Sequence, residues 1–181
     1  MDENEKTINE TNDKSNEKES VPGFLKSVII EYKVLFIIML TIIIVYNVSF
    51  RVFLQMVTVP SESMENTIQV GDHAIGVRNA DIERQDIIIF WCESEQSVYI
   101  KRVIGIPGDK VEITPDSVIV NGAKLDEPYL KEKIDDDDPL VCELAENEYF
   151  VMGDNRYGSI DSREFGPVKE SDIQSKVIKI Y

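Results

Sequence analysis

The feature that most constrains this chain is an uncharged apolar run at residues 34–50, VLFIIMLTIIIVYNVSF, flanked by Lys33 and Arg51. As an α-helix this run would extend about 26 Å, close to the hydrocarbon thickness of a bilayer, and further apolar residues continue beyond both cations. Apolar side chains would cover every side of such a helix, so the run does not fit an amphipathic surface helix. The sequence therefore predicts a transmembrane anchor over residues 28–54, with the lipid bilayer as its partner.

Two other interpretations compete with a retained anchor. A buried core helix is disfavoured, because long uncharged runs rich in isoleucine are rare in small soluble domains. A cleaved signal peptide fits poorly, because the preceding residues are not basic overall and the first alanine of the chain is Ala74. We therefore expect the anchor to be retained.

The distribution of cations predicts how the anchor is oriented. Several lysines precede the run closely, whereas Arg51 is the only cation that follows it before Arg78. By the positive-inside rule the N-terminus is then cytoplasmic, and residues 55–181 form an extracytoplasmic domain at the cell membrane. Residues 1–20 are almost entirely polar, so we expect residues 1–27 to form a disordered cytoplasmic tail.

Charge and composition exclude several classes of protein. The 181 residues include 34 acidic and 19 basic side chains, a net charge of −15, which argues against binding nucleic acid. Two cysteines are too few for a disulfide framework, and neither CxxC nor HExxH spacing occurs. The acidic run IDDDDP at 134–139 has no EF-hand spacing around it, so an exposed loop is favoured over a calcium site. Whether Cys92 and Cys142 pair is left open.

The pattern of the remaining residues predicts a mainly β domain. Short segments rich in β-branched and aromatic residues alternate with turn dipeptides such as Asn121-Gly122. No stretch has a convincing helical period, apart from a possible turn near 64–69. The expected strands lie at 86–91, 98–106, 148–154 and 176–181, with a hairpin or meander over 110–125.

Within the expected strand at 98–106, Lys101 and Arg102 stand among apolar neighbours. Strand alternation would put Tyr99 and Lys101 on one face and Arg102 on the other. Composition favours two cations that extend from a sheet surface into solvent. If Lys101 were buried without a counter-charge, however, its pKa would fall and its neutral amine could act as a general base.

Serines in two loops could take part in chemistry. Ser61 and Ser63 follow Pro60, but a serine hydroxyl is a weak nucleophile unless a base removes its proton. The only histidine, His73, has no obvious orienting acid, so we interpret it as structural and an amine as the better candidate base.

The segment GDNRYGSIDSR at 153–163 crowds hydroxyl, carboxylate and guanidinium groups into one loop. Such a loop can satisfy itself through turns and Asp–Arg pairs, and it can also form a wall of an active site. These two interpretations are compatible.

Three motifs taken in order, PSESMENT, YIKRVIGIPGD and GDNRYGSIDSR, resemble those of the bacterial type I signal peptidases, in particular the compact Gram-positive members. The resemblance covers roughly residues 57–181. It implies a β-rich membrane serine protease with a Ser/Lys dyad that removes signal peptides from exported preproteins and requires no metal or cofactor. It also favours a buried Lys101.

Carried over by position, the resemblance implies a role for each residue of the expected site. Ser63 matches the nucleophile and Lys101 the general base. The Ser63 amide and the Ser61 hydroxyl match the oxyanion hole. Ser159 matches the residue that orients the lysine amine, and Asp161 and Arg163 match a supporting ion pair.

One departure from the family pattern is Asn66, which stands where the family has proline. Proline would restrict the backbone just after the nucleophile, whereas asparagine leaves the loop more freedom. Two alternatives to a signal peptidase stay open. One is a self-cleaving Ser/Lys peptidase, and the other is an inactive, membrane-anchored binding relative.

Overall fold

The computed structural model describes residues 22–130 and 139–181. The predictions for residues 1–20 and for nearly all of the acidic run at 134–139 fall outside these ranges. The chain divides into two units, with the boundary between Asn47 and Val48. Each unit is described separately below.

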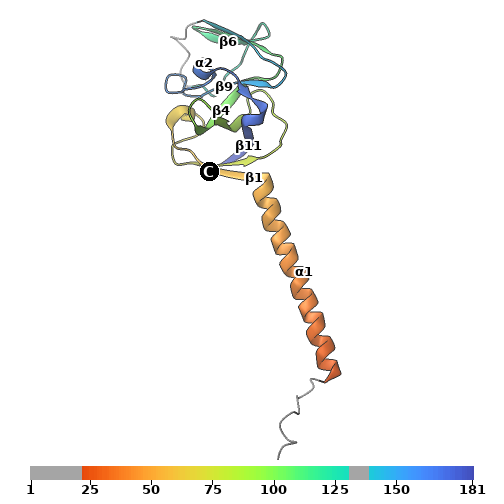
Figure 1. The fold of residues 1–181 in the computed structure, drawn as a ribbon. Coiled ribbons are helices and arrows are strands. Elements are labelled where there is room, and N and C mark those ends of the chain that lie inside the picture. The colour runs from red at the N-terminus through yellow and green to blue at the C-terminus, as the bar shows by residue number, and fades with distance from the viewer. Residues whose placement is uncertain (1–21, 131–138) are drawn as a thin grey trace, which may run out of the picture. The chain divides into compact units, whose positions relative to one another are not determined.

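The first helix, α1, extends from Gly23 to Phe53. It begins inside the segment 1–27 that was expected to be a disordered tail, because apolar residues continue ahead of the uncharged run and Pro22 accepts the first helical hydrogen bond, from the amide of Lys26. At 1.5 Å per residue, its 31 residues extend about 46 Å, more than a bilayer core requires. Figure 1 shows α1 as one continuous helix.

Polar side chains in the middle of α1 bond to the helix itself. Thr41 Oγ1 donates to the Ile37 carbonyl and Asn47 Nδ2 donates to the Ile43 carbonyl, both at 2.8 Å. A helix in hydrocarbon must satisfy its polar groups internally in this way. No residue in the most apolar window of the helix is buried by the rest of the protein.

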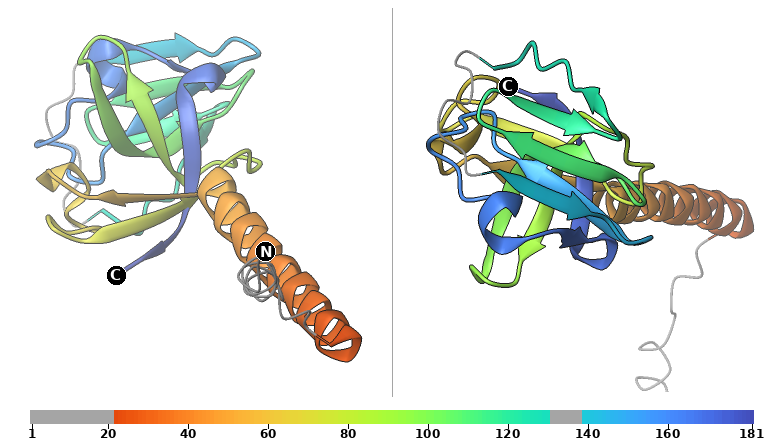
Figure 2. Two further views of the ribbon diagram at one scale, coloured as in Figure 1. Left: turned by 60° about the horizontal axis from the view of Figure 1, so that its bottom comes forward. Right: turned by 90° about the horizontal axis from the view of Figure 1, so that it is seen from above.

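The β domain contains two antiparallel sheets (Figures 1 and 2). The larger sheet has seven strands in the order β1-β2-β11-β3-β4-β9-β10. Its strands are β1 (Leu54–Thr58), β2 (His73–Val77), β3 (Ile87–Cys92), β4 (Ser97–Gly105), β9 (Glu148–Met152), β10 (Val168–Lys169) and β11 (Ile173–Ile180). The mainly β prediction is confirmed.

The smaller sheet has four strands in the order β7-β6-β5-β8. They are β5 (Lys110–Thr114), β6 (Ser117–Val120), β7 (Ala123–Lys124) and β8 (Leu140–Glu143). The segment 110–125 is therefore a meander, as predicted, with Asn121 and Gly122 at positive φ in the turn between β6 and β7. The domain also contains the short helices η1 (Glu62–Met64), α2 (Ser162–Phe165) and η2 (Glu170–Asp172).

Three apolar clusters form the core, and all of them include residues of β4. Ile104 packs with the smaller sheet, Val103 packs with β3 and β9, and Ile100 packs under the loop that carries η1. β4 pairs with β3 along residues 97–102 and with β9 along residues 102–105. It is also covered on both faces, so its central residues are withdrawn from water whichever way they point.

Candidate active site

Lys101 lies in the middle of β4, opposite Ile88 of β3, and only 3% of the residue is exposed. The structure therefore supports the buried interpretation of this lysine over the surface interpretation. Its Nζ lies 5.1 Å from the centroid of the Tyr99 ring, which shares its face of the strand. Among the described residues, no carboxylate forms an ion pair with this amine.

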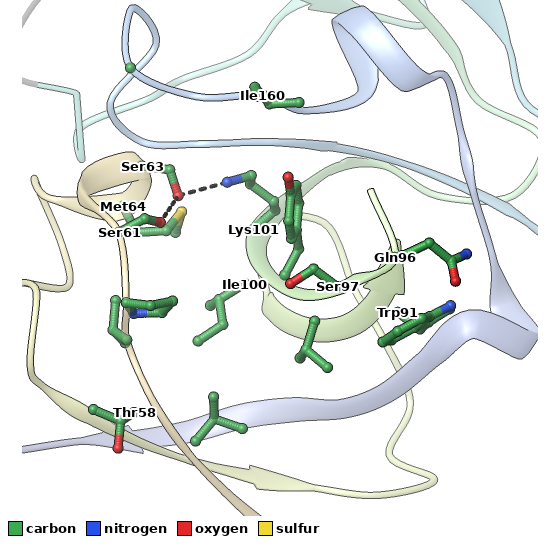
Figure 3. A pocket seen from close by; sticks show the side chains of 16 residues that line it. Thr58, Ser61, Ser63, Met64, Trp91, Gln96, Ser97, Ile100, Lys101 and Ile160 are labelled. Carbon is green, nitrogen blue, oxygen red and sulfur yellow. Dashed lines mark hydrogen bonds between the residues drawn. The ribbon is translucent and has the colours of Figure 1, made fainter. Parts of the chain in front are cut away.

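Ser63 is held beside Lys101 by the helical turn η1. Backbone bonds from the amides of Thr67 and Ile68 to the Met64 carbonyl continue the turn, close to the 64–69 range expected from the sequence. Met64 and Ile68 are buried in the core and fix the turn there. The Lys101 Nζ donates to Ser63 Oγ at 2.6 Å (Figure 3).

Burial alters the acidity of the Lys101 amine. It lowers the pKa from the ordinary 10.5 to about 8, mainly because the charged form loses its hydration. Asp161 opposes this shift and Arg163 assists it. An amine with this pKa is substantially neutral at mildly alkaline pH, so it can accept a proton from the hydroxyl that it contacts.

Ser61 completes one side of the site. Its Oγ lies 3.3 Å from Ser63 Oγ, and Figure 3 shows both oxygens on the same side of the cavity. The backbone N–H of Ser63 lies in the first turn of η1, where amides have no partner within the helix. An amide and a hydroxyl are thus available near the reactive oxygen.

Asp161 organises the loop that follows β9. This fully buried carboxylate accepts hydrogen bonds from the Gly153 amide at 2.9 Å and from the Ser159 hydroxyl at 2.8 Å. It also pairs with the Arg163 guanidinium, whose Nε is 2.8 Å away, and it caps α2. The expected Asp161–Arg163 ion pair is therefore present in the structure.

Ser159 lies at the closest approach of this loop to the nucleophile turn. A Cβ on Gly153 would lie 2.2 Å from Ser159 Oγ and 2.5 Å from the Ser63 carbonyl oxygen, so only glycine fits there. The Ser159 hydroxyl donates to Asp161, and no hydrogen bond joins it to Lys101 in the described part of the chain. Any influence of Ser159 on the lysine therefore acts through packing and through Asp161.

A second network was not identified from the sequence. The Arg102 guanidinium binds both oxygens of Asp154, at 2.8 and 2.7 Å, and the Thr67 hydroxyl also donates to this carboxylate. The Tyr129 ring lies over the guanidinium, 4.0 Å from the ring centroid to Cζ. The signal available in the sequence was Arg102 beside the candidate lysine and Asp154 in the GDNR motif.

Asn66, which replaces the family proline, joins this network. Its Nδ2 donates to the Asp154 carbonyl at 2.9 Å. The Asn155 amide donates to the Ser63 carbonyl at 3.0 Å, so the two loops are linked on both sides of Met64. Instead of leaving the loop free, the asparagine side chain connects it to the loop after β9.

His73 and the two cysteines lie outside the cluster. The exposed His73 lies at the start of β2, where its Nδ1 is 3.0 Å from Thr58 Oγ1. Cys92 and Cys142 are both free thiols. The interpretation of His73 as structural agrees with this placement.

The two reactive side chains open into a cavity of about 540 Å³ (Figure 3). Its walls come from residues 57–61 on one side and from residues 97–101 of β4 on the other. An extended chain segment laid between these walls would pass directly beside Ser63.

Comparison with known proteins gives the family. The profile of the family described as "Signal peptidase, peptidase S26" matches residues 29–181. Signal peptidase IB of Staphylococcus aureus is 35% identical over 141 residues, which cover 66% of this chain and 73% of that protein. Signal peptidase I P of Bacillus subtilis subsp. natto is 40% identical over 103 residues, covering 51% of this chain and 56% of that protein.

Among solved structures, a signal peptidase I from Enterococcus faecalis is 31% identical. The match covers 55% of this chain and 98% of that one, with a TM-score of 0.49. The family profile covers most of the chain, including every residue of the Ser63–Lys101 cluster. The chain therefore belongs to the signal peptidases of family S26 and is a serine hydrolase of that family.

Proposed function

We propose that this protein is a membrane-anchored endopeptidase that removes signal peptides from exported preproteins, with Ser63 as nucleophile and Lys101 as general base. The single observation that carries the assignment is the 2.6 Å contact between Ser63 Oγ and a buried lysine amine that has no counter-ion among the described residues. Family membership supports the reaction, which is hydrolysis of a peptide bond by a serine.

The reaction begins when neutral Lys101 accepts the Ser63 proton. Ser63 Oγ attacks the carbonyl carbon of the scissile bond, and the resulting oxyanion accepts hydrogen bonds from the Ser63 amide and the Ser61 hydroxyl. Loss of one such donor typically costs about 2.7–4 kcal/mol of transition-state stabilisation. Lys101 then returns its proton to the leaving amine. A water molecule, deprotonated by the same amine, hydrolyses the acyl-enzyme and regenerates Ser63.

Ser159, Asp161 and Arg163 act as positioning residues. Asp161 holds Ser159 and Gly153 against the nucleophile turn, and Arg163 holds Asp161. Their charges act in opposite directions on the Lys101 amine, since Asp161 raises its pKa and Arg163 lowers it. Burial remains the main cause of the lowered pKa, and the two charges act on it in opposite directions.

The substrate is an extended segment with small side chains before the cut, bound between residues 57–61 and β4. β1 is the outermost strand of the larger sheet, so within residues 22–130 and 139–181 one of its edges has no strand partner and is available for an added strand. Residues 28–54 anchor the enzyme, with the tail 1–27 in the cytoplasm and the catalytic domain, residues 55–181, on the extracytoplasmic face. The anchor keeps enzyme and membrane-inserted preprotein in one plane.

The test is cleavage of a model preprotein by the full-length protein in detergent micelles, with the cut site determined by mass spectrometry. Wild type should release the signal peptide after a small residue, and Ser63→Ala should release none while keeping the wild-type circular dichroism spectrum. Cleavage of only its own chain would instead indicate a self-cleaving peptidase. Absence of cleavage, together with no labelling of Ser63 by a serine-directed acylating reagent, would indicate an inactive relative.

A further inference from the structure

The cavity beside Ser63 continues well past the reactive groups. Besides Ser63 and Lys101, its lining includes Trp91, Gln96 and Ser97, at the turn end of the β3–β4 hairpin. Ser97 lies four positions before Lys101 in β4, which corresponds to about 13 Å along a strand. In Figure 3, Trp91 and Gln96 lie at the far end of the cavity from Ser63. The mechanism above makes no use of this end.

Apolar side chains of β3 and β4, namely Trp91, Val98 and Ile100, line part of the cavity. In β3 and β4, Ile89 pairs with Ile100, and two residues further along Trp91 pairs with Val98, on the same face of the hairpin. Ile89 is fully buried near the nucleophile turn, whereas Trp91 is 38% exposed at the open end. The far end therefore presents an indole ring to the bound segment. Large aromatic rings supply much of the binding energy where they are covered by a partner.

The spacing identifies which part of a substrate would reach this ring. If the cleaved bond lies at Ser63 and the peptide is extended along β4, each substrate residue advances about 3.3 Å. The fourth and fifth residues from the cut then lie opposite Ser97 and Trp91. In a signal peptide the apolar stretch precedes the short cleavage segment, so an apolar platform suits the N-terminal side of the cut.

We propose that Trp91 is a specificity-determining residue that contacts the fourth and fifth substrate residues before the cleaved bond and favours large apolar side chains over charged ones there. This inference rests on the proposed function, because it takes the position of the cut from Ser63. Trp91 thereby contacts the end of the apolar stretch of a signal peptide and fixes the distance between that stretch and the nucleophile.

Trp91 is the only tryptophan of the chain, so its fluorescence reports occupancy of this end directly. Full-length Ser63→Ala in detergent micelles would be titrated with two peptides that differ only in where they begin, three or six residues before the cut. Binding of both would be measured independently by anisotropy of a C-terminal dye. The longer peptide should shift Trp91 emission to the blue and protect it from acrylamide, and the shorter peptide should do neither.

Kinetics supply the second measurement. Trp91→Ala should raise KM for the longer peptide about tenfold and leave KM for the shorter one unchanged, while Trp91→Phe keeps most of the affinity. Leucine-to-aspartate replacement at the fifth residue before the cut should reduce kcat/KM in wild type and have little effect in Trp91→Ala. Val141→Ala removes another exposed apolar side chain, in the smaller sheet, and serves as the matched control.

The outcomes separate the two proposals. If the longer peptide binds and is cleaved by wild type but Trp91 emission and quenching do not change, the Trp91 assignment is wrong and the proposed function stands. An equal effect of Trp91→Ala on both peptides would also overturn the assignment. If wild type cleaves neither peptide nor any preprotein, it is the proposed function that fails.

Discussion

Lys101 and Arg102 are neighbours in β4, and their side chains enter opposite faces of the same strand. Both residues are buried, at 3% and 8% exposure. Arg102 has a bidentate carboxylate partner in Asp154, whereas Lys101 donates to a serine hydroxyl and pairs with no carboxylate among the described residues. The guanidinium side therefore holds a fixed charge, and the amine side holds a group that can lose its charge.

The difference shows that burial by itself does not decide what a cation does. A paired guanidinium is a structural element, because its charge is neutralised and its donors are satisfied. For an amine without a carboxylate partner, desolvation outweighs the opposing charges and lowers the pKa to about 8. One strand thus provides a rigid face and a reactive face, and Asp154 extends the rigid face to the loop that carries Ser63.

The largest effect is expected when the reactive face also carries a cation that cannot lose its proton. Lys101→Arg puts a group that remains protonated beside Ser63 and should lower kcat about 10²–10⁴-fold, the usual contribution of a general base. Turnover of a preprotein under saturating conditions measures this effect. Lys101→Met, which removes the amine without burying a new charge, should be equally inactive. Near-normal turnover by Lys101→Arg would show that another group is the base.

The next largest effect is on stability and concerns the rigid face. Asp154→Asn leaves the Arg102 charge buried without its partner, which typically costs about 3–5 kcal/mol. Lys101→Met should cost little or even stabilise the fold, because it removes an unpaired buried amine. Urea unfolding of the full-length variants, followed by Trp91 fluorescence, compares the two. Equal losses for both substitutions would mean that the partner of a buried cation is unimportant here.

Prediction from sequence succeeded for strands with a local signal and failed where that signal was too short or concealed. Strands β3, β4 and β9 were predicted because alternation and β-branched residues are local signals. β1 was missed because its apolar residues continue the long run of the anchor, which concealed the change from helix to strand at Leu54. β10 has two residues and α2 has four, too few to establish a period.

The site was predictable only in part for the same reason. In the local sequence pattern, Lys101 and Arg102 both stand among apolar neighbours and cannot be told apart. The difference comes from their distant partners: Ser63 lies 38 residues from Lys101, and Asp154 lies 52 residues from Arg102. Ordered motifs brought these residues together by family resemblance, which spacing alone could not do. The hydrogen bond from Asn66 to the Asp154 carbonyl was not predictable, because it depends on the path of two loops.

A change of pH provides a further test, because it alters the protonation of the Lys101 amine on the reactive face. Below about pH 8 the Lys101 amine is protonated and cannot accept the Ser63 proton, so kcat/KM should rise about tenfold per pH unit and level off above the pKa of about 8. The stability of the fold should also rise with pH, because the pKa of this amine is lower in the folded state than its ordinary 10.5.

Between these two values the unfolded chain binds more protons at this site, so wild type should gain stability relative to Lys101→Met as pH rises from about 8 to 10.5. Cleavage rates and urea unfolding measured over the same pH series test both statements. Loss of activity in His73→Ala would transfer the role of base to the histidine.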